Sequence, residues 1–209
     1  MANDALPLPI LVTGGTGFAG RHLLQTLLDA GYTNLHTTHF GSQSLPEVCQ
    51  SEYVSVHKVN LTVPTEVNEL IKRVSPSQIY HLASFAAVGK SFEQAEHIIN
   101  NNVMLQLHLL NAVKEFAAAA KILIIGSAEE YGRVPKELQG RKIDESFPFN
   151  PINPYAVTKV TQDLLAQAFY FSYKLQILRV RPFNHIGEGQ TIDFVIPAFA
   201  SQIVAVEQG

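Results

Sequence analysis

Two side chains in the second half of the chain have the types and spacing that acid–base chemistry needs. Tyr155 and Lys159 stand four residues apart in "NPYAVTKVTQDLL", and on a helix this spacing places both on one face. An ammonium near a phenol stabilises the phenolate, so we expect the pKa of Tyr155 to lie below its usual value of about 10. Such a tyrosine could exchange a proton with a substrate near neutral pH. The alternative is an exposed pair without function.

Two further polar residues follow the apolar run "KILIIG". Ser127 would stand at the carboxyl end of a strand, where open α/β sheets bind their ligands. Its hydroxyl could hydrogen-bond the substrate oxygen that Tyr155 protonates, or it could only cap a turn or helix. Glu129 is either a catalytic base or a solvated loop carboxylate.

A glycine-rich turn near the start of the chain is the element that would bring a cofactor to these residues. "LVTGGTGFAG" places Gly14, Gly17 and Gly20 at intervals of three, and Gly15–Gly20 also reads G-x-G-x-x-G. The first glycines allow the turn and the approach of a pyrophosphate, and Gly20 lets the helix pack on the strand. The anion would sit at the helix N-terminus. The alternative is a turn that only joins a strand to a helix.

The second predicted strand bears on the choice between NAD and NADP. Dinucleotide sites usually carry an acidic residue about 20 positions after the glycines, which binds the adenosine ribose. The segment "HTTHFGSQS" contains no Asp or Glu. Three of its side chains could accept a 2′-phosphate instead, namely His39, Ser42 and Ser44. We therefore favour NADP over NAD, unless the loop is simply polar.

Short apolar runs alternate with longer helical patterns along the chain. We expect strands at 9–14, 34–40, 53–59, 78–84, 121–127 and 175–182. We expect helices at 18–30, 64–74, 91–100, 101–119, 155–172 and 194–208. This alternation predicts an α/β fold, a Rossmann-type doubly wound parallel sheet with helices on both faces. The long polar stretch 133–154 should lie over a ligand site.

Composition indicates which classes of binding partner and which cellular compartment to expect. The chain has 209 residues and a net charge of −3, and no cluster of Lys and Arg stands out. We therefore expect neither a nucleic-acid nor a membrane partner, and we predict no metal site. The single cysteine fits a reducing compartment. The start lacks the pattern of a signal peptide, and no apolar run reaches the roughly 18 residues of a spanning helix. A cytoplasmic location is the expectation.

Taken together, the glycine turn, Ser127 and Tyr155-x-x-x-Lys159 resemble the extended short-chain dehydrogenases/reductases, the NAD-dependent epimerase/dehydratase family. "YHLAS" (80–84) is similar to the segment beside the cofactor, and Asn102 to the asparagine of the following helix. The resemblance implies the catalytic residues Ser127, Tyr155 and Lys159. It implies cofactor contacts by Gly14, Gly17, Phe18, Gly20, Asn60, Leu61, Ala83, Tyr155 and Lys159. It implies substrate contacts by Ser127, Glu129 and Asn184.

A narrower likeness lies in "RPFNHIGEGQ", "DFVIPAFASQI" and "AAVGKSFE". These resemble the branch of GDP-4-keto-6-deoxymannose reductases and GDP-mannose 4,6-dehydratases. The resemblance implies hydride transfer from NAD(P)H to the sugar C4 carbonyl, with the proton supplied by Tyr155. Dehydratase, 4-epimerase and a non-catalytic dinucleotide-binding module remain alternatives. Asn184 would either contact the diphosphate of the nucleotide sugar or cap a turn. His185 would either line the substrate cleft or be a packing residue whose hydrogen bonds are satisfied.

The chain also departs from the family pattern. Asn60 replaces an aspartate beside the adenine, Glu188 replaces a proline, and Leu105-Gln106 replaces Gly-Thr. Family members continue well beyond this point, so we expect 1–209 to be the NAD(P)-binding domain. Residues 182–209 would begin a substrate-binding region whose remainder is largely missing. Relatives often dimerise through the helices at 101–119 and 155–172, and we expect a homodimer. The second helix carries apolar residues for this or for the core at Val160, Leu164, Leu165 and Phe169.

Overall fold

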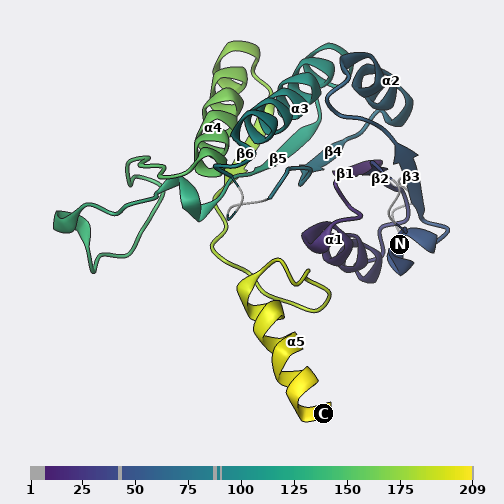
Figure 1. Ribbon diagram of the computed structural model, residues 1–209. Helices are drawn as coiled ribbons and strands as arrows, with labels where there is room; N and C mark the ends of the chain where they lie inside the picture. Colours follow the sequence, from purple (N-terminus) through teal and green to yellow (C-terminus); the bar gives the residue numbers. More distant parts are fainter. Residues whose placement is uncertain (1–7, 42–43, 87–88, 90, 209) are drawn as a thin grey trace.

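The computed structural model describes residues 8–41, 44–86, 89 and 91–208, and its centre is one parallel sheet (Figure 1). Six strands pair in the order β3-β2-β1-β4-β5-β6. They are β1 (Ile10–Thr13), β2 (Leu35–His39), β3 (Val54–Lys58), β4 (Gln78–His81), β5 (Lys121–Ile125) and β6 (Gln176–Val180). Every pairing is parallel. The order reverses between β1 and β4, which is where doubly wound sheets bind their ligands. The predicted fold class is confirmed.

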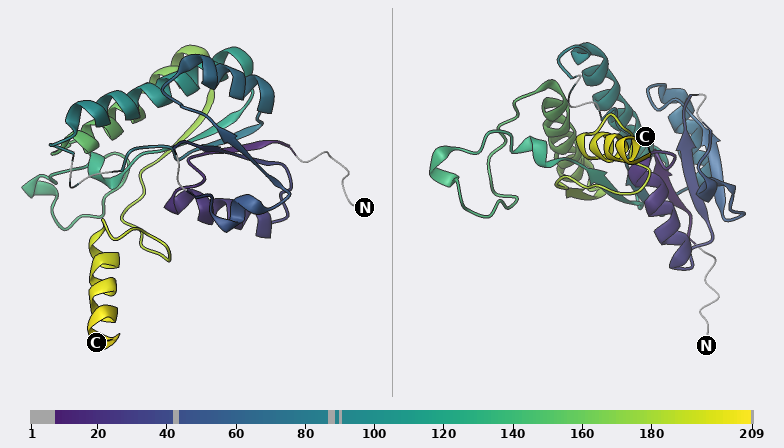
Figure 2. Two further views of the ribbon diagram at one scale, coloured as in Figure 1. Left: turned by 45° about the vertical axis from the view of Figure 1, so that its right-hand side comes forward. Right: turned by 60° about the horizontal axis from the view of Figure 1, so that its bottom comes forward.

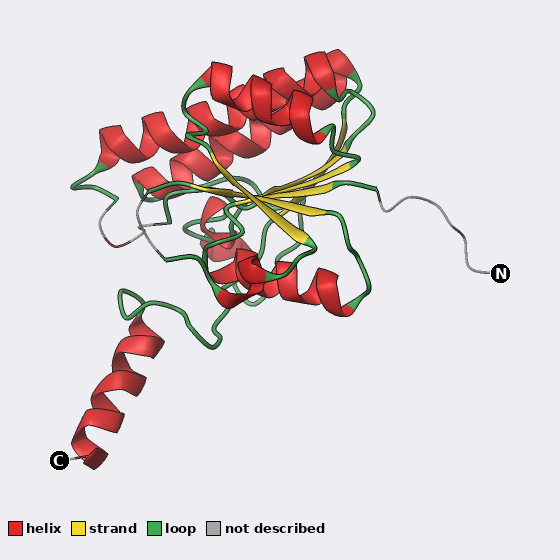
Figure 3. Ribbon diagram, turned by 90° about the vertical axis from the view of Figure 1, so that its right-hand side faces the viewer, coloured by secondary structure: helices red, strands yellow, loops and turns green. Residues whose placement is uncertain are grey.

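Helices cover both faces of the sheet, as a buried parallel sheet requires. The long helices are α1 (Phe18–Asp29), α2 (Pro64–Val74), α3 (Ala95–Phe116), α4 (Pro154–Tyr173) and α5 (Val195–Gln208). Short 3-10 turns lie at η1 (Glu47–Gln50), η3 (Ala128–Glu130) and η4 (Lys136–Leu138). Figure 3 shows helices on both faces of the sheet. Helices α2, α3 and α4 lie on one face, and α1 lies on the other (Figure 1). Each face has its own apolar cluster, so the strands are fixed from two sides.

The sequence patterns at 91–100 and 101–119 belong to one helix, not two. Helix α3 runs for 22 residues without a break. Asparagine often ends a helix by bonding its own backbone, but Asn102 is fully buried and bonds elsewhere. Its Oδ1 accepts from the Phe85 N–H at 2.7 Å and its Nδ2 donates to Thr158 Oγ1 at 3.2 Å. Because tertiary hydrogen bonds occupy the Asn102 side chain, it does not compete for the backbone groups of the helix.

The chain after β6 differs from the rest. Helix α5 has no buried residue, and it projects away from the sheet in the left view of Figure 2. Several large apolar side chains on it are exposed, namely Val195, Ile196, Phe199, Ile203, Val204 and Val206. Such a run of exposed apolar surface is unusual for a folded domain. Within the described part of the chain, no helix is both long and apolar enough to cross a membrane.

Candidate active site

The glycine turn between β1 and α1 is shaped by close backbone approach. Gly14 has φ +72°, and a Cβ there would lie 2.8 Å from the Ala83 nitrogen. A Cβ on Gly20 would collide with the Gly14 carbonyl oxygen. The Gly17 N–H donates to that same oxygen at 3.0 Å. Larger residues at Gly14 or Gly20 would therefore push β1, β4 and α1 apart.

The first turn of α1 fits the diphosphate of a dinucleotide. Gly17 is the N-cap, and within the described residues no side chain caps this end. The first turn holds no acidic residue. The free N–H groups and the helix dipole together favour an anion here. An open, uncapped helix end beside two glycines that tolerate no side chain is the arrangement a pyrophosphate needs.

The ends of β2 and β3 would face the adenosine half of such a ligand. His39 is the last residue of β2 and is half-buried, Ser44 is exposed, and Ser42 lies outside the described residues. Asn60 follows β3, and its Oδ1 accepts from the Thr62 N–H at 3.0 Å and from the Thr62 hydroxyl at 2.7 Å. This local bonding needs only an oxygen acceptor, so an aspartate would serve equally well. The 2′-phosphate assignment stays a prediction.

Leu61 and Ala83 are held in place by backbone contacts. Leu61 is buried, and its carbonyl oxygen lies 3.3 Å from Nδ1 of His108. The Ala83 N–H donates to the Thr13 hydroxyl at 3.3 Å, which ties the end of β4 to the end of β1. Ala83 thus forms one wall of the glycine turn, where the family resemblance expects cofactor contacts.

Ser127, Tyr155 and Lys159 come together at the carboxyl end of β5. Ser127 caps η3, and Tyr155 begins the first turn of α4. The Ser127 side chain lies near enough to the Tyr155 hydroxyl to lower the pKa of that phenol. Nζ of Lys159 donates to the Ile125 carbonyl oxygen at 2.9 Å and lies 5.8 Å from the centre of the Tyr155 ring. Both α4 residues are buried, at 8% and 4% exposure.

The local sequence explains why these side chains are fixed. Asn153 caps α4, where its side chain accepts from the Ala156 N–H at 2.8 Å. Pro154 follows it with the backbone angle that a first helical residue requires. The other end of the Asn153 amide donates to Glu129 Oε2 at 3.1 Å. One asparagine therefore links the start of α4 to the turn that carries Ser127.

The pKa of Tyr155 differs from the sequence expectation. The pKa is raised to about 12, chiefly by burial and also by the charges of Glu129 and Glu130, while an interaction with the Ser127 side chain lowers it by less. The expected lowering by Lys159 is wrong for this state, because the ammonium is directed to the Ile125 carbonyl and burial dominates. Burial also lowers the pKa of Lys159 to about 8, against the opposing charge of Glu130. At neutral pH Tyr155 is a phenol, ready to donate a proton.

The predicted substrate residues are spread more widely. Glu129 is half-buried beside Asn153, whereas Asn184 is exposed in the segment after β6. His185 stacks on Phe18 with ring centres 5.8 Å apart, and Arg21 donates to the backbone carbonyls of Glu188 and Gly189. Residues 185–189 therefore lie against the first turn of α1, on the side chain of Phe18.

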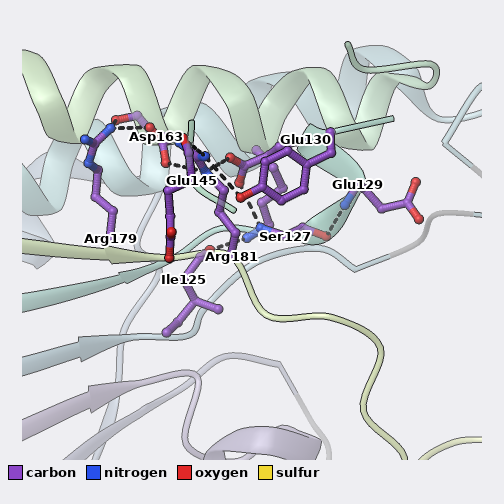
Figure 4. A network of polar contacts seen from close by, with 10 residues as sticks. Ile125, Ser127, Glu129, Glu130, Glu145, Asp163, Arg179 and Arg181 are labelled. Carbon is purple, nitrogen blue, oxygen red and sulfur yellow. Dashed lines mark hydrogen bonds and ion pairs between the residues drawn. The ribbon is translucent and has the colours of Figure 1, made fainter. Parts of the chain in front are cut away.

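Sequence reasoning missed four charged residues beneath the site (Figure 4). Asp163 of α4 pairs with Arg179 of β6, and its Oδ2 lies 3.3 Å from Nε of Arg181. Glu130 pairs with the same Arg181 nitrogen at 3.0 Å. The signal was present in "SAEEYG" and "LRVRPFNH", where charged residues directly adjoin the ends of apolar strands. Their meeting across two strands could not be deduced from spacing.

His81 was also missed. It is buried, and its Nδ1 lies 2.8 Å from the Thr13 hydroxyl. Burial, and secondarily Lys159, lowers its pKa to about 3, so it is neutral at ordinary pH. Its place directly under the glycine turn makes it a structural neighbour of the cofactor region.

The long stretch 133–154 is anchored by Arg181. The guanidinium donates to the Glu145 carbonyl at 3.3 Å and lies 4.5 Å from the centre of the Phe149 ring. It also donates to the Tyr131 hydroxyl at 3.3 Å. One arginine thus fixes the stretch beside the end of β5, next to Ser127.

Comparisons with known proteins bear on this arrangement. The family model described as GDP-mannose 4,6 dehydratase matches residues 11–209. The GDP-6-deoxy-D-mannose reductase of Pseudomonas aeruginosa is 32% identical over 200 residues, which cover 96% of this chain and 60% of that protein. The chain therefore spans less than two thirds of the length of that relative.

Solved structures of other proteins are also similar to this chain in fold and sequence. RMD from Pseudomonas aeruginosa, complexed with NADPH, is 31% identical with a TM-score of 0.77, covering 97% of this chain and 61% of that one. The UDP-glucose 4-epimerase of Thermus thermophilus, complexed with NAD, is 26% identical with a TM-score of 0.79, covering 88% and 58%. The fold, the glycine turn and the family match converge: the chain belongs to the GDP-mannose 4,6 dehydratase family of the extended short-chain dehydrogenases/reductases.

Proposed function

We propose that the protein is an NAD(P)H-dependent nucleotide-sugar oxidoreductase that reduces a GDP-4-keto-6-deoxyhexose at C4. One observation carries the proposal. Ser127, Tyr155 and Lys159 meet at the carboxyl end of β5. The uncapped first turn of α1 follows β1, which is a strand of the same sheet. The carboxyl ends of β1 and β5 lie at one edge of the parallel sheet, near the point where the strand order reverses, and this supports a proton donor and an anion site that serve the same ligand.

The mechanism assigns one task to each side chain. Ser127 hydrogen-bonds the carbonyl oxygen of the substrate and orients it. Tyr155 donates its phenolic proton to that oxygen as negative charge develops there. Lys159 would hold the nicotinamide ribose, and Gly14, Gly17 and the first N–H groups of α1 would hold the diphosphate. A bound nicotinamide dinucleotide supplies the hydride.

The cofactor is NADP or NAD, with a preference for NADP. The solved relatives include one protein complexed with NADPH and one complexed with NAD. Support for NADP comes from the end of β2, where the sequence holds no carboxylate to repel a 2′-phosphate. We therefore expect tighter binding of NADPH than of NADH.

Reduction is favoured over dehydration by the state of Tyr155. With its pKa raised to about 12, Tyr155 is protonated at neutral pH, which is the form that a proton donor in a reductase must have. A reductase needs the donor, whereas dehydratases and epimerases begin by removing a proton from the C4 hydroxyl. The 4,6-dehydratase is the alternative that one observation supports, because Glu129 stands beside the site as a carboxylate that could take the C5 proton. A 4-epimerase and a non-catalytic dinucleotide-binding module are the remaining alternatives.

Two further assignments belong to the proposal. Residues 182–209 begin the substrate-binding region, which agrees with the exposure of α5 and of Asn184. The protein forms a homodimer through α3 and α4, because Val157, Leu164 and Phe171 form an exposed apolar line at intervals of seven on α4. The single cysteine, buried and free, suits a cytoplasmic protein.

Thermal unfolding with separate ligands tests the function. A ligand at about 100 times its Kd should stabilise the fold by roughly 2.7 kcal/mol. We expect NADPH and GDP-sugars to raise the melting temperature, and UDP- and dTDP-sugars to do so less. Consumption of NADPH with a GDP-4-keto sugar would then identify the reductase, and exchange of the C5 proton with solvent the dehydratase. No response to either dinucleotide would contradict the proposal.

A further inference from the structure

The carboxyl group of Glu130 is fully buried and bonded to the backbone of Ser127. Figure 4 shows it turned inward toward Arg181 while Glu129 points away. Its Oε1 accepts from the Ser127 N–H at 2.8 Å. Its Oε2 forms the ion pair with Arg181, although this geometry gives Oε2 no hydrogen bond from the described residues.

The backbone has been shaped to admit this carboxyl group. A Cβ on Gly126 would collide with Glu130 Oε1 and lie 2.9 Å from the Val180 carbonyl oxygen. Gly126 directly precedes Ser127, and its φ is not in the left-handed region, so space rather than backbone conformation requires the glycine. The end of β5 is therefore built around the Glu130 side chain.

Glu130 completes a reciprocal cap on the turn that carries Ser127. The Ser127 hydroxyl accepts from the Glu129 N–H at 3.1 Å, while the Glu130 carboxylate accepts from the Ser127 N–H. This capping box satisfies two N–H groups at once. It fixes the backbone of Ser127 and so limits where its hydroxyl can point toward Tyr155.

Glu130 also lies in the corner that holds the ammonium of Lys159, because Nζ of Lys159 donates to the carbonyl of Ile125 and the Glu130 carboxylate fills the space beside the next residue, Gly126. The negative charge of Glu130 favours the protonated form of Lys159 and opposes ionisation of Tyr155. Without it, burial alone would act on the ammonium of Lys159 and release its proton at lower pH. Several titratable or charged groups face this cluster: Glu129 and Tyr131 from its own turn, Tyr155, Lys159 and Asp163 from α4, Arg179 and Arg181 from β6 and the residues after it, and His81 from β4.

We propose that Glu130 is a positioning residue with two roles: its buried carboxylate fixes the Ser127 backbone, and it places a negative charge in the corner that holds the ammonium of Lys159. The inference rests on the proposed function for its consequence in catalysis. Its effect on Lys159 is a property of the chain itself and can be measured without any turnover. Burial, chiefly, raises the pKa of Glu130 to about 7, so its charge depends on pH in the working range.

The test is an NMR titration of Lys159 in chains carrying lysine labelled with carbon-13 at Cε, assigned with Lys159→Arg. Glu130→Gln keeps an oxygen acceptor for the Ser127 N–H but removes the charge, so we expect the pKa of Lys159 to fall by about one pH unit. Glu130→Asp keeps the charge and should restore the titration almost fully. An unmoved Lys159 midpoint in Glu130→Gln overturns the proposal.

Asp163→Asn is the matched control. It removes a carboxylate of similar burial from the same Arg181. That carboxylate does not hold the Ser127 backbone, and its charge raises the pKa of Glu130 rather than shifting that of Lys159 or Tyr155. A merely structural role for Glu130 would give both variants the same loss of stability and leave the Lys159 midpoint in place. A shift confined to Glu130→Gln supports the proposal, and equal shifts in both variants contradict it.

The unaltered chain provides a test that needs no folded variant. Because coupled groups titrate in steps that belong to the pair, the Lys159 signal must show a second, smaller step where Glu130 titrates. A single-step curve contradicts the proposal. Turnover separates this outcome from the fate of the proposed function. If no nucleotide sugar is turned over, the enzyme assignment fails while the titration still decides the role of Glu130. If turnover occurs, the alkaline limb of its pH profile must move to lower pH in Glu130→Gln.

Discussion

The two halves of the candidate site are built on opposite principles. At the β1–α1 turn, side chains are missing, and Gly14, Gly17 and Gly20 leave the backbone bare. At the β5–α4–β6 corner, charged side chains are packed below the surface, with Glu130, Lys159 and Asp163 all at 4% exposure or less. The turn would recognise a ligand through N–H groups and the helix dipole, which need no reorganisation. The corner sets the protonation of the residues that would react.

Because of this difference, we expect substitutions in the two halves to change different properties of the protein. A substitution in the turn introduces atoms where none fit, so ligand binding and packing suffer together. A substitution of Tyr155 or Glu130 in the corner removes a proton or a charge, so reactivity and pH dependence change while the ligand still binds. The predictions below test that separation.

The largest effect is expected from Tyr155→Phe. The variant keeps the ring and loses the proton donor, so turnover of a GDP-4-keto sugar should fall about 10²- to 10⁴-fold. The NADPH-induced rise in melting temperature should remain. Tyr170→Phe, an exposed tyrosine on the same helix, is the control and should keep full turnover. Undiminished turnover in Tyr155→Phe would remove this residue from the mechanism.

The next effect concerns the turn, where Gly14→Ala and Gly31→Ala form a matched pair. Both glycines have positive φ, +72° and +86°, but only Gly14 has backbone atoms in the space of a Cβ. Gly31→Ala should lose about 1 kcal/mol of stability from its backbone conformation alone. Gly14→Ala should lose more and should no longer respond to NADPH. Equal stability losses and an intact NADPH response in both would contradict our account of the turn.

An effect of intermediate size is expected on the pH dependence of the free energy of unfolding, through Lys159. Its pKa is lowered from 10.5 to about 8 in the folded chain. Between these values the unfolded chain binds a proton that the folded chain does not, so raising the pH through this window stabilises the fold. Lys159→Met removes that contribution. The free energy of unfolding of the unaltered chain, measured by urea titration relative to the variant, should rise across this window and level off above it. Parallel curves for the two chains would speak against a buried ammonium.

The smallest effect is expected from Asn60→Asp. Asn60 uses its Oδ1 to accept from Thr62, and a carboxylate can accept the same bonds. Stability should change by no more than about 0.5 kcal/mol. The affinity for NADPH and NADH, measured by calorimetry, should change by a similarly small amount. A large gain in NADH affinity alone would show that this departure from the family pattern sets the cofactor preference.

The sequence could predict the parts of the fold that periodicity and local chemistry determine. The six strands, the first two helices and the strand–glycine–helix opening all follow from apolar patterns and turn residues. The predicted break between residues 100 and 101 was wrong, because Asn102 is satisfied by Phe85 and Thr158, which lie far from it in sequence. A pattern of residue types cannot show where a buried amide finds its partners.

The site was predictable to a similar limit. The spacing of Tyr155 and Lys159 predicts that they share a face, but not that Lys159 donates to the carbonyl of Ile125 on a neighbouring strand. Nor does the spacing show the depth of burial, which is the main cause of the raised pKa of Tyr155. The pairing of Asp163 and Glu130 with Arg181 likewise depends on β5 and β6 lying side by side. Burial and long-range pairing are tertiary properties, and no short motif encodes them.

Hydride transfer measured by isotope label tests the central claim most directly. The chain is incubated with a GDP-4-keto-6-deoxyhexose and NADPH carrying deuterium at nicotinamide C4, separately on each face of the ring, and the sugar product is analysed by mass spectrometry. Our account predicts deuterium at the sugar C4 from one face only. It is contradicted if NADPH binds, as shown by thermal stabilisation, and yet no deuterium reaches any nucleotide sugar.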